Sequence, residues 1–122
     1  MLDTSFLMLA GAILLGSLLA VLYLRTTGAA SAPWLLALMH GALGIGGLGV
    51  LALTLRGPPR GLGQGTGSFG MISFGLLALA TIAGIGLLVA HWRRQRAGML
   101  LGLHATLAVG GFVILTAYVF TG

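Results

Sequence analysis

Four long apolar stretches follow one another along the chain, and short polar or glycine-rich segments separate them. The stretches cover residues 5–24, 33–55, 69–92 and 98–120, and none of them contains an arginine. A helix needs about 20 apolar residues to cross a hydrocarbon core about 30 Å thick. The pattern therefore predicts four transmembrane helices within a single transmembrane domain that covers residues 1–122.

The segments between these stretches carry residues that end helices and form turns. Residues 25–32 precede Pro33, which suits the first position of a helix, and residues 56–68 combine prolines with a glycine run. Residues 93–97 form a short third connection. We therefore expect an all-α, up-down-up-down bundle. The run at residues 61–67 lacks the Gly-Lys-Ser/Thr ending of a phosphate-binding loop, so we expect a flexible outer loop there.

Composition narrows the function. Hydrophobic residues make up 58% of the chain and charged residues 6%, with a mean hydropathy of +1.13, which excludes a soluble enzyme. The absence of cysteine excludes disulfides and thiolate metal sites. Asp3 is the only acidic residue, so the carboxylate typical of a proton-coupled transporter is missing. No set of nucleophile, base and acid is visible, and a stand-alone enzyme is less well supported than an electron-transfer or accessory subunit.

All the formal positive charge comes from six arginines that flank the apolar stretches, so they indicate a membrane protein and not a nucleic-acid-binding one. Four arginines lie on one side, Arg25, Arg93, Arg94 and Arg96, and Arg56 and Arg60 lie on the other. The positive-inside rule places the larger group in the cytoplasm. We expect a multi-pass protein of a bacterial inner membrane, with loops 25–32 and 93–97 cytoplasmic and both termini periplasmic.

The second and fourth stretches repeat one another when Leu36 is aligned with Leu100. The shared pattern is a histidine followed, after five positions, by two glycines, and it places His40 and His104 at equivalent positions. The first and third stretches match more loosely, through Phe6 with Phe74 and Gly16 with Gly84. We interpret the chain as two tandem helix hairpins, residues 5–55 and 69–120, related by a pseudo-two-fold axis along the membrane normal.

His40 and His104 are the residues of this chain that are candidates for binding a cofactor. Both lie about 10 Å below the cytoplasmic surface, on helices that run parallel in the predicted bundle. Two imidazoles at one depth that point at a shared axis match bis-histidine axial ligation of a haem iron. The sequence therefore predicts one haem b held by these two histidines.

Small residues follow each histidine along the same helix face, and they would leave room for a flat macrocycle. They are Gly44, Gly47, Ala108 and Gly111. The cytoplasmic arginines, Arg25, Arg93, Arg94 and Arg96, are candidates to pair with haem propionates. Glycine also serves plain helix packing, as in the stripe Gly98-x3-Gly102-x3-Thr106-x3-Gly110. Packing without a cofactor therefore stays open as an alternative.

His91 has no matched partner in the repeat. It stands beside Trp92 and two arginines at the cytoplasmic end of its helix, which is typical of an interfacial belt. A third ligand, a propionate contact or a quinone contact is the functional alternative. Met39 and Met99 are weaker candidates for an axial ligand.

On the two matched histidines, the chain resembles the small four-helix membrane cytochromes b, in the broad manner of the cytochrome b561 group. The resemblance implies haem b and electron transfer between a quinol or ascorbate pool and a partner. Two-haem members of that group need four histidines, whereas this chain has three. One haem is therefore the most that bis-histidine ligation allows here.

Other functions remain open at this stage. The chain has the size of a cofactor-free accessory subunit of a larger respiratory or photosynthetic membrane complex. The histidines could instead each ligate the magnesium of a bacteriochlorophyll. Expected partners are membrane lipid, larger membrane-protein subunits and a quinone, with no nucleic acid.

Overall fold

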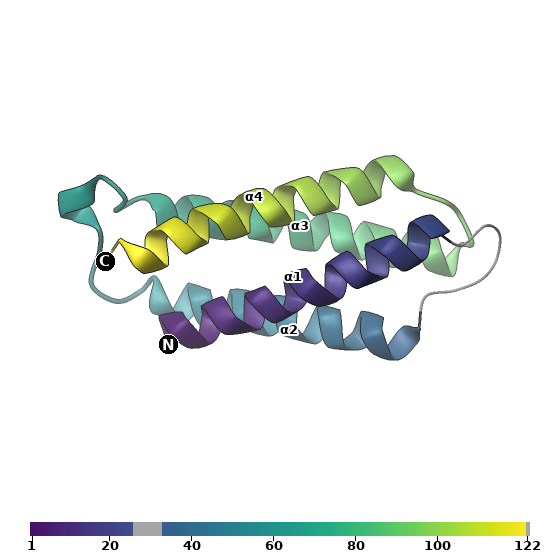
Figure 1. Cartoon of the computed structure of the whole chain (residues 1–122), viewed down its shortest axis with the longest axis horizontal. Helices are drawn as coiled ribbons and strands as arrows, with labels where there is room; N and C mark the ends of the chain where they lie inside the picture. Colours follow the sequence, from purple (N-terminus) through teal and green to yellow (C-terminus); the bar gives the residue numbers. More distant parts are fainter. Residues whose placement is uncertain (26–32, 122) are drawn as a thin grey trace.

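The chain forms four long helices that follow one another in sequence and are connected by loops. A computed structural model describes residues 1–25 and 33–121. The helices of this described part are α1 (Leu2–Arg25), α2 (Trp34–Thr54), α3 (Phe69–Trp92) and α4 (Gly98–Phe120), with a 3-10 turn, η1 (Leu62–Gln64), between α2 and α3 (Figure 1). All four are long and apolar enough to cross a membrane.

The helix bounds agree closely with the apolar stretches. α3 and α4 begin and end at the predicted residues, and α1 is a few residues longer than predicted, since it begins at Leu2. Pro33 and Leu55 lie just outside α2 as its flanking cap residues. Of the first predicted connection, residues 26–32 lie outside the described residues. The prediction of an all-α chain with four membrane-length helices is confirmed.

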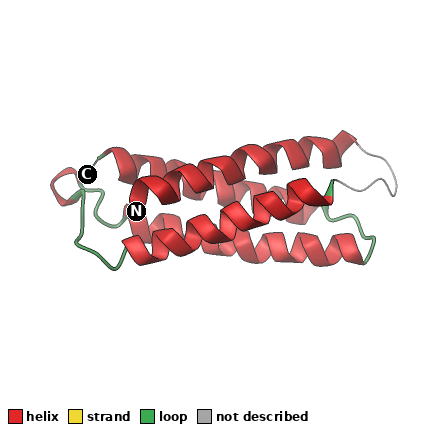
Figure 2. Cartoon of the chain, turned by 90° about the horizontal axis from the view of Figure 1, so that it is seen from below, coloured by secondary structure: helices red, strands yellow, loops and turns green. Residues whose placement is uncertain are grey.

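Consecutive helices run in opposite directions along the long axis, so that both termini lie at the same end (Figures 1 and 2). α1 packs mainly on α2, and α3 mainly on α4. The contacts between these two hairpins are fewer, and they run along two seams, α1 with α4 and α2 with α3. α2 and α4 are therefore diagonal to one another.

The apolar core lies at the end that carries the termini, which we call the terminal end. Its buried side chains come from all four helices: Leu2, Leu9, Leu51, Leu77, Leu115 and Tyr118. Phe6 packs against this cluster and stacks on Phe112. Toward the opposite end, none of the described residues in 13–25, 34–46, 84–92 and 98–110 is buried. The hairpins are thus joined tightly through one half of their length.

The loop between α2 and α3 folds back onto the terminal end of α4. Gly61 and Gly65 have φ angles of 72° and 73°, and this left-handed conformation, which glycine adopts freely, brackets the turn η1. The Thr66 hydroxyl lies 2.7 Å from the Thr121 hydroxyl, and Arg60 donates a hydrogen bond of 2.9 Å to the carbonyl of Val119. These contacts hold the two ends of the loop, Arg60 and Thr66, against α4, whereas residues 62–65 between them are exposed.

Candidate functional site

His40 reaches from α2 onto α1. Its Nδ1 lies 2.8 Å from the carbonyl oxygen of Ala12, at hydrogen-bond distance. The ring rests on Gly16, one turn further along α1, where a Cβ atom would stand 2.8 Å from the His40 Cε1. Only glycine at this position leaves the imidazole in place. Helix α1 therefore supplies both the hydrogen-bond acceptor, Ala12, and a residue without a Cβ, Gly16, on which the ring packs; we call such a residue a seat glycine.

His104 makes the same contacts in the other hairpin. Its Nδ1 lies 2.6 Å from the carbonyl oxygen of Ala80 on α3. A Cβ atom on Gly84 would stand 2.9 Å from the His104 Cε1. Ala12 is as far from Ala80 along the chain as Gly16 is from Gly84. The two histidines are therefore held by equivalent residues of equivalent helices.

The carbonyl partners determine which ring nitrogen carries the proton. A carbonyl oxygen only accepts hydrogen bonds, so each Nδ1 must be the donor. In a neutral imidazole the other nitrogen, Nε2, then carries the free lone pair. Among the described residues, neither Nε2 has a hydrogen-bond partner. This is the arrangement in which metal-binding histidines are held, with one nitrogen oriented by a backbone carbonyl and the other free for the metal.

The two rings meet between the hairpins. Their centroids are 6.0 Å apart, and their planes are inclined by 85°. A metal–imidazole bond is about 2 Å and a ring nitrogen lies about 1 Å from the ring centre, so two trans imidazoles on one metal have centroids about 6 Å apart. An inclination of 85° is that of two rings that meet edge to face. The separation therefore suits one metal ion between the rings.

One buried serine in each hairpin bonds its two helices together, on the terminal side of the histidine. Ser5 donates a hydrogen bond of 2.8 Å to the carbonyl of Gly47, and Ser73 donates one of the same length to the carbonyl of Gly111. The serines and the two seat glycines are the supporting residues that the sequence analysis did not assign. The signal was present, since Ser5 and Ser73 follow the same alignment that relates Gly16 to Gly84.

The predicted small-residue lining divides into two groups. Gly47 and Gly111 are buried within their own hairpins, because Leu9 and Leu77 lie against them. Gly44 and Ala108 lie one turn from the histidines and are half-buried, and the nearest atom to a Cβ on Gly44 would be the Ala12 Cβ at 4.0 Å. The glycine pair at 47 and 111 thus brings helices together, and only Gly44 and Ala108 stay close to the histidine level.

The four predicted cytoplasmic arginines lie together at the end opposite the terminal end, where α1 ends and the connection between α3 and α4 runs (Figure 1). Arg96 lies over the Tyr23 ring, with its guanidinium carbon 4.7 Å from the ring centroid. The Tyr23 hydroxyl accepts a hydrogen bond of 2.9 Å from the Ala97 amide, which joins the two hairpins at this end. Arg25, Arg93 and Arg94 are exposed.

His91 is exposed in the last turn of α3 and does not join the histidine pair. Met39 and Met99 are exposed as well. Within residues 1–25 and 33–121, no group of three or more histidine, cysteine or acidic side chains is placed to hold a metal ion. His40 and His104 thus supply two ligands between them.

Comparison with known protein families, with curated proteins and with solved structures gives no match for this chain. The function must therefore be argued from the chain's own residues and their geometry.

Proposed function

We propose that this chain is a membrane-embedded b-type haem subunit that passes electrons, with one haem held between His40 and His104. One observation carries the proposal: two imidazoles on diagonal helices stand 6.0 Å apart, and each is oriented through Nδ1 by a carbonyl of its own hairpin. Each Nε2 would then be available to bind the haem iron.

The two-ligand donor set favours a macrocycle over a bare metal ion. Structural zinc takes four protein ligands in a tetrahedral arrangement, and a catalytic zinc takes three. The described residues around this pair offer no third ligand. A porphyrin would supply the remaining four nitrogen ligands itself, and bis-imidazole ligation then completes the coordination of its iron.

The same separation argues against two pigments at this position. If each histidine ligated the magnesium of its own bacteriochlorophyll, two metals and two macrocycles would have to fit between the rings. With centroids 6.0 Å apart and metal–nitrogen bonds of about 2 Å, there is length for one metal ion. One shared cofactor is therefore the better fit.

In this proposal the haem iron supplies one-electron chemistry, and the protein supplies ligands, orientation and a low-dielectric site. Ala12 and Ala80 fix the tautomer of the ligands, while Gly16 and Gly84 fix the ring positions. Among the arginines predicted to pair with propionates, Arg96 lies over Tyr23, whose hydroxyl accepts the hydrogen bond from Ala97 that links the two hairpins.

We further propose that the helices cross a bacterial inner membrane up-down-up-down, as two hairpin repeats, with the arginine-rich end in the cytoplasm. The arginine distribution and the four membrane-length helices support this placement. Electrons would come from a quinol or a neighbouring subunit, and the exposed apolar helix faces suit lipid or larger membrane subunits as neighbours.

A visible spectrum of protein purified from membranes in mild detergent tests the proposal. We expect a b-type α-band in the reduced-minus-oxidised spectrum and about one haem per chain on extraction. His40→Ala and His104→Ala should each remove the low-spin band, whereas the matched control His91→Ala should keep it. A band that survives both replacements contradicts the proposal. A colourless protein that co-purifies with larger subunits would support a cofactor-free accessory role instead.

A further inference from the structure

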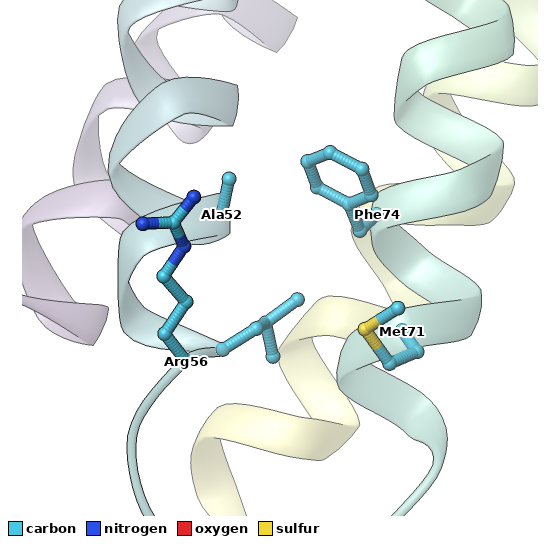
Figure 3. A pocket seen from close by; sticks show the side chains of 5 residues that line it. Ala52, Arg56, Met71 and Phe74 are labelled. Atoms are coloured by element: carbon cyan, nitrogen blue, oxygen red, sulfur yellow. The ribbon is translucent and has the colours of Figure 1, made fainter.

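A small hollow lies on the α2–α3 seam near the terminal end of the bundle. Its volume is about 210 Å³, and it is lined by Ala52, Leu55, Arg56, Met71 and Phe74 (Figure 3). Arg56 and Met71 are exposed, so the hollow opens on the outside of the bundle. Figure 3 shows the Arg56 side chain extending along α2 to the level of Ala52, with Phe74 across the hollow on α3.

The equivalent seam of the other pair of helices is filled. Alignment of the two hairpins relates Arg56 to Phe120 and Phe74 to Phe6. Phe6 and Phe120 meet edge to face with centroids 5.9 Å apart, and Phe6 also stacks on Phe112 at 5.2 Å. Phe112 corresponds to Leu48. Two aromatic residues of the α1–α4 seam thus correspond to leucine and arginine in the α2–α3 seam, and the arginine, Arg56, lines the hollow.

Within the part of the chain that the structure describes, no counter-charge pairs with the guanidinium beside the hollow. Asp3 is the only acidic residue of the whole chain, and among the described residues the Arg56 side chain forms neither an ion pair nor a hydrogen bond. A guanidinium beside apolar surface fits an anionic headgroup that accepts two hydrogen bonds, such as a phosphate.

We infer that the α2–α3 seam binds one phospholipid, with an acyl-chain segment in the hollow and the phosphate on Arg56. A cavity for a complete small-molecule ligand is typically about 300–1,000 Å³, so a hollow of about 210 Å³ suits part of a chain better than a ring system. The apolar lining matches an acyl chain, and the position of Arg56 just beyond α2 matches the headgroup level. The inference requires a membrane but not the haem.

Native mass spectrometry of the whole protein in detergent, titrated with phosphatidylglycerol, tests this site. We expect one lipid to bind more tightly than the rest, and Arg56→Gln to weaken that binding about tenfold or more, since a charge-assisted contact is lost. Arg93→Gln, which removes an exposed arginine at the opposite end, is the matched control and should keep the affinity. Dioleoylglycerol, which lacks the phosphate, should bind weakly to the parent protein and no worse to Arg56→Gln.

A second variant tests the apolar half of the site. Leu48→Phe with Arg56→Phe copies the aromatic residues of the α1–α4 seam into the α2–α3 seam, and we expect it to abolish tight binding of the lipid in the same mass measurement. Equal affinity in Arg56→Gln and the parent protein would overturn the proposed headgroup contact. Dioleoylglycerol binding as tightly as phosphatidylglycerol would overturn it too. Because these readouts use mass and not colour, their failure is distinct from failure of the haem proposal.

Discussion

The substitution Gly16→Ala tests whether the contact between Gly16 and the His40 ring positions that ring, without altering the rest of the fold. The added Cβ would stand 2.8 Å from Cε1 and 3.2 Å from Nδ1 of His40, whereas carbon atoms in contact normally lie about 3.5–4.0 Å apart. The ring must therefore move by about 1 Å. That movement would lengthen the 2.8 Å hydrogen bond to the Ala12 carbonyl beyond useful range.

The expected magnitudes separate folding from ligand binding. Loss of one side-chain hydrogen bond inside a membrane protein costs about 0.6 kcal/mol on average and at most about 1.7 kcal/mol. Replacing a helical glycine by alanine returns about 0.5–1 kcal/mol. The free energy of unfolding should therefore change by less than about 1 kcal/mol. Removing a partner that orients a metal ligand lowers affinity about 10–100-fold, so haem affinity should fall by that factor.

Haem titration of the purified protein in detergent, together with unfolding in mixed micelles, measures both quantities. Gly84→Ala should behave like Gly16→Ala, because its Cβ would stand 2.9 Å from the His104 ring. Gly41→Ala is the matched control, since a Cβ there has no neighbour within 4 Å although it adjoins His40 in sequence. Unchanged haem affinity in Gly16→Ala, or an equal loss in Gly41→Ala, would refute the claim that Gly16 positions the His40 ring.

Three further substitutions test the packing around the site. Ser73→Ala should lower the free energy of unfolding by about 0.6–1.7 kcal/mol in mixed micelles, because it removes the buried bond to Gly111, whereas exposed Ser17→Ala should change it little. Phe112→Leu, which copies Leu48, should cost about 0.5–1.5 kcal/mol in the same assay by removing the ring stacked on Phe6; no change would show that the stacking adds nothing. Tyr23→Phe should speed hydrogen exchange at the Ala97 amide and leave exchange in the terminal half unaltered, and equal rates at Ala97 would contradict that joint.

The helices could be predicted from the sequence because a membrane span needs only length and apolar composition. The approximate bounds predicted for the last two helices, 69–92 and 98–120, agree with the structure, and for the first of these Ser68 and the arginines at 93 and 94 mark the changes in polarity. The loop between α2 and α3 contacts α4 in a way that the sequence analysis did not predict. Its docking depends on Thr121 and Val119, which lie at the far end of the next hairpin in sequence, and no local pattern encodes that contact.

In the candidate site, too, some features could be predicted from the sequence and others could not. The repeat placed His40 and His104 at one level, but whether the rings face one another depends on how far each helix is rotated about its axis. That rotation is set by Ser5, Ser73 and the seat glycines, each of which bonds or contacts the partner helix of its own hairpin. Gly47 and Gly111 were expected beside the cofactor because they share a helix face with the histidines, yet Leu9 and Leu77 occupy the space against them.

The two hairpins are equivalent where the histidines lie and different where the outer seams lie, and this contrast bears on function. In the proposed haem site both histidines would bind one metal, and Ala12 with Ala80 and Gly16 with Gly84 hold the two rings through equivalent contacts. At the outer seams, Phe120 packs against Phe6 in the α1–α4 seam, whereas Arg56 lies beside an open hollow in the α2–α3 seam. If the proposed function holds, the duplicated fold would keep equivalent contacts around the two histidines while its two outer seams present different residues.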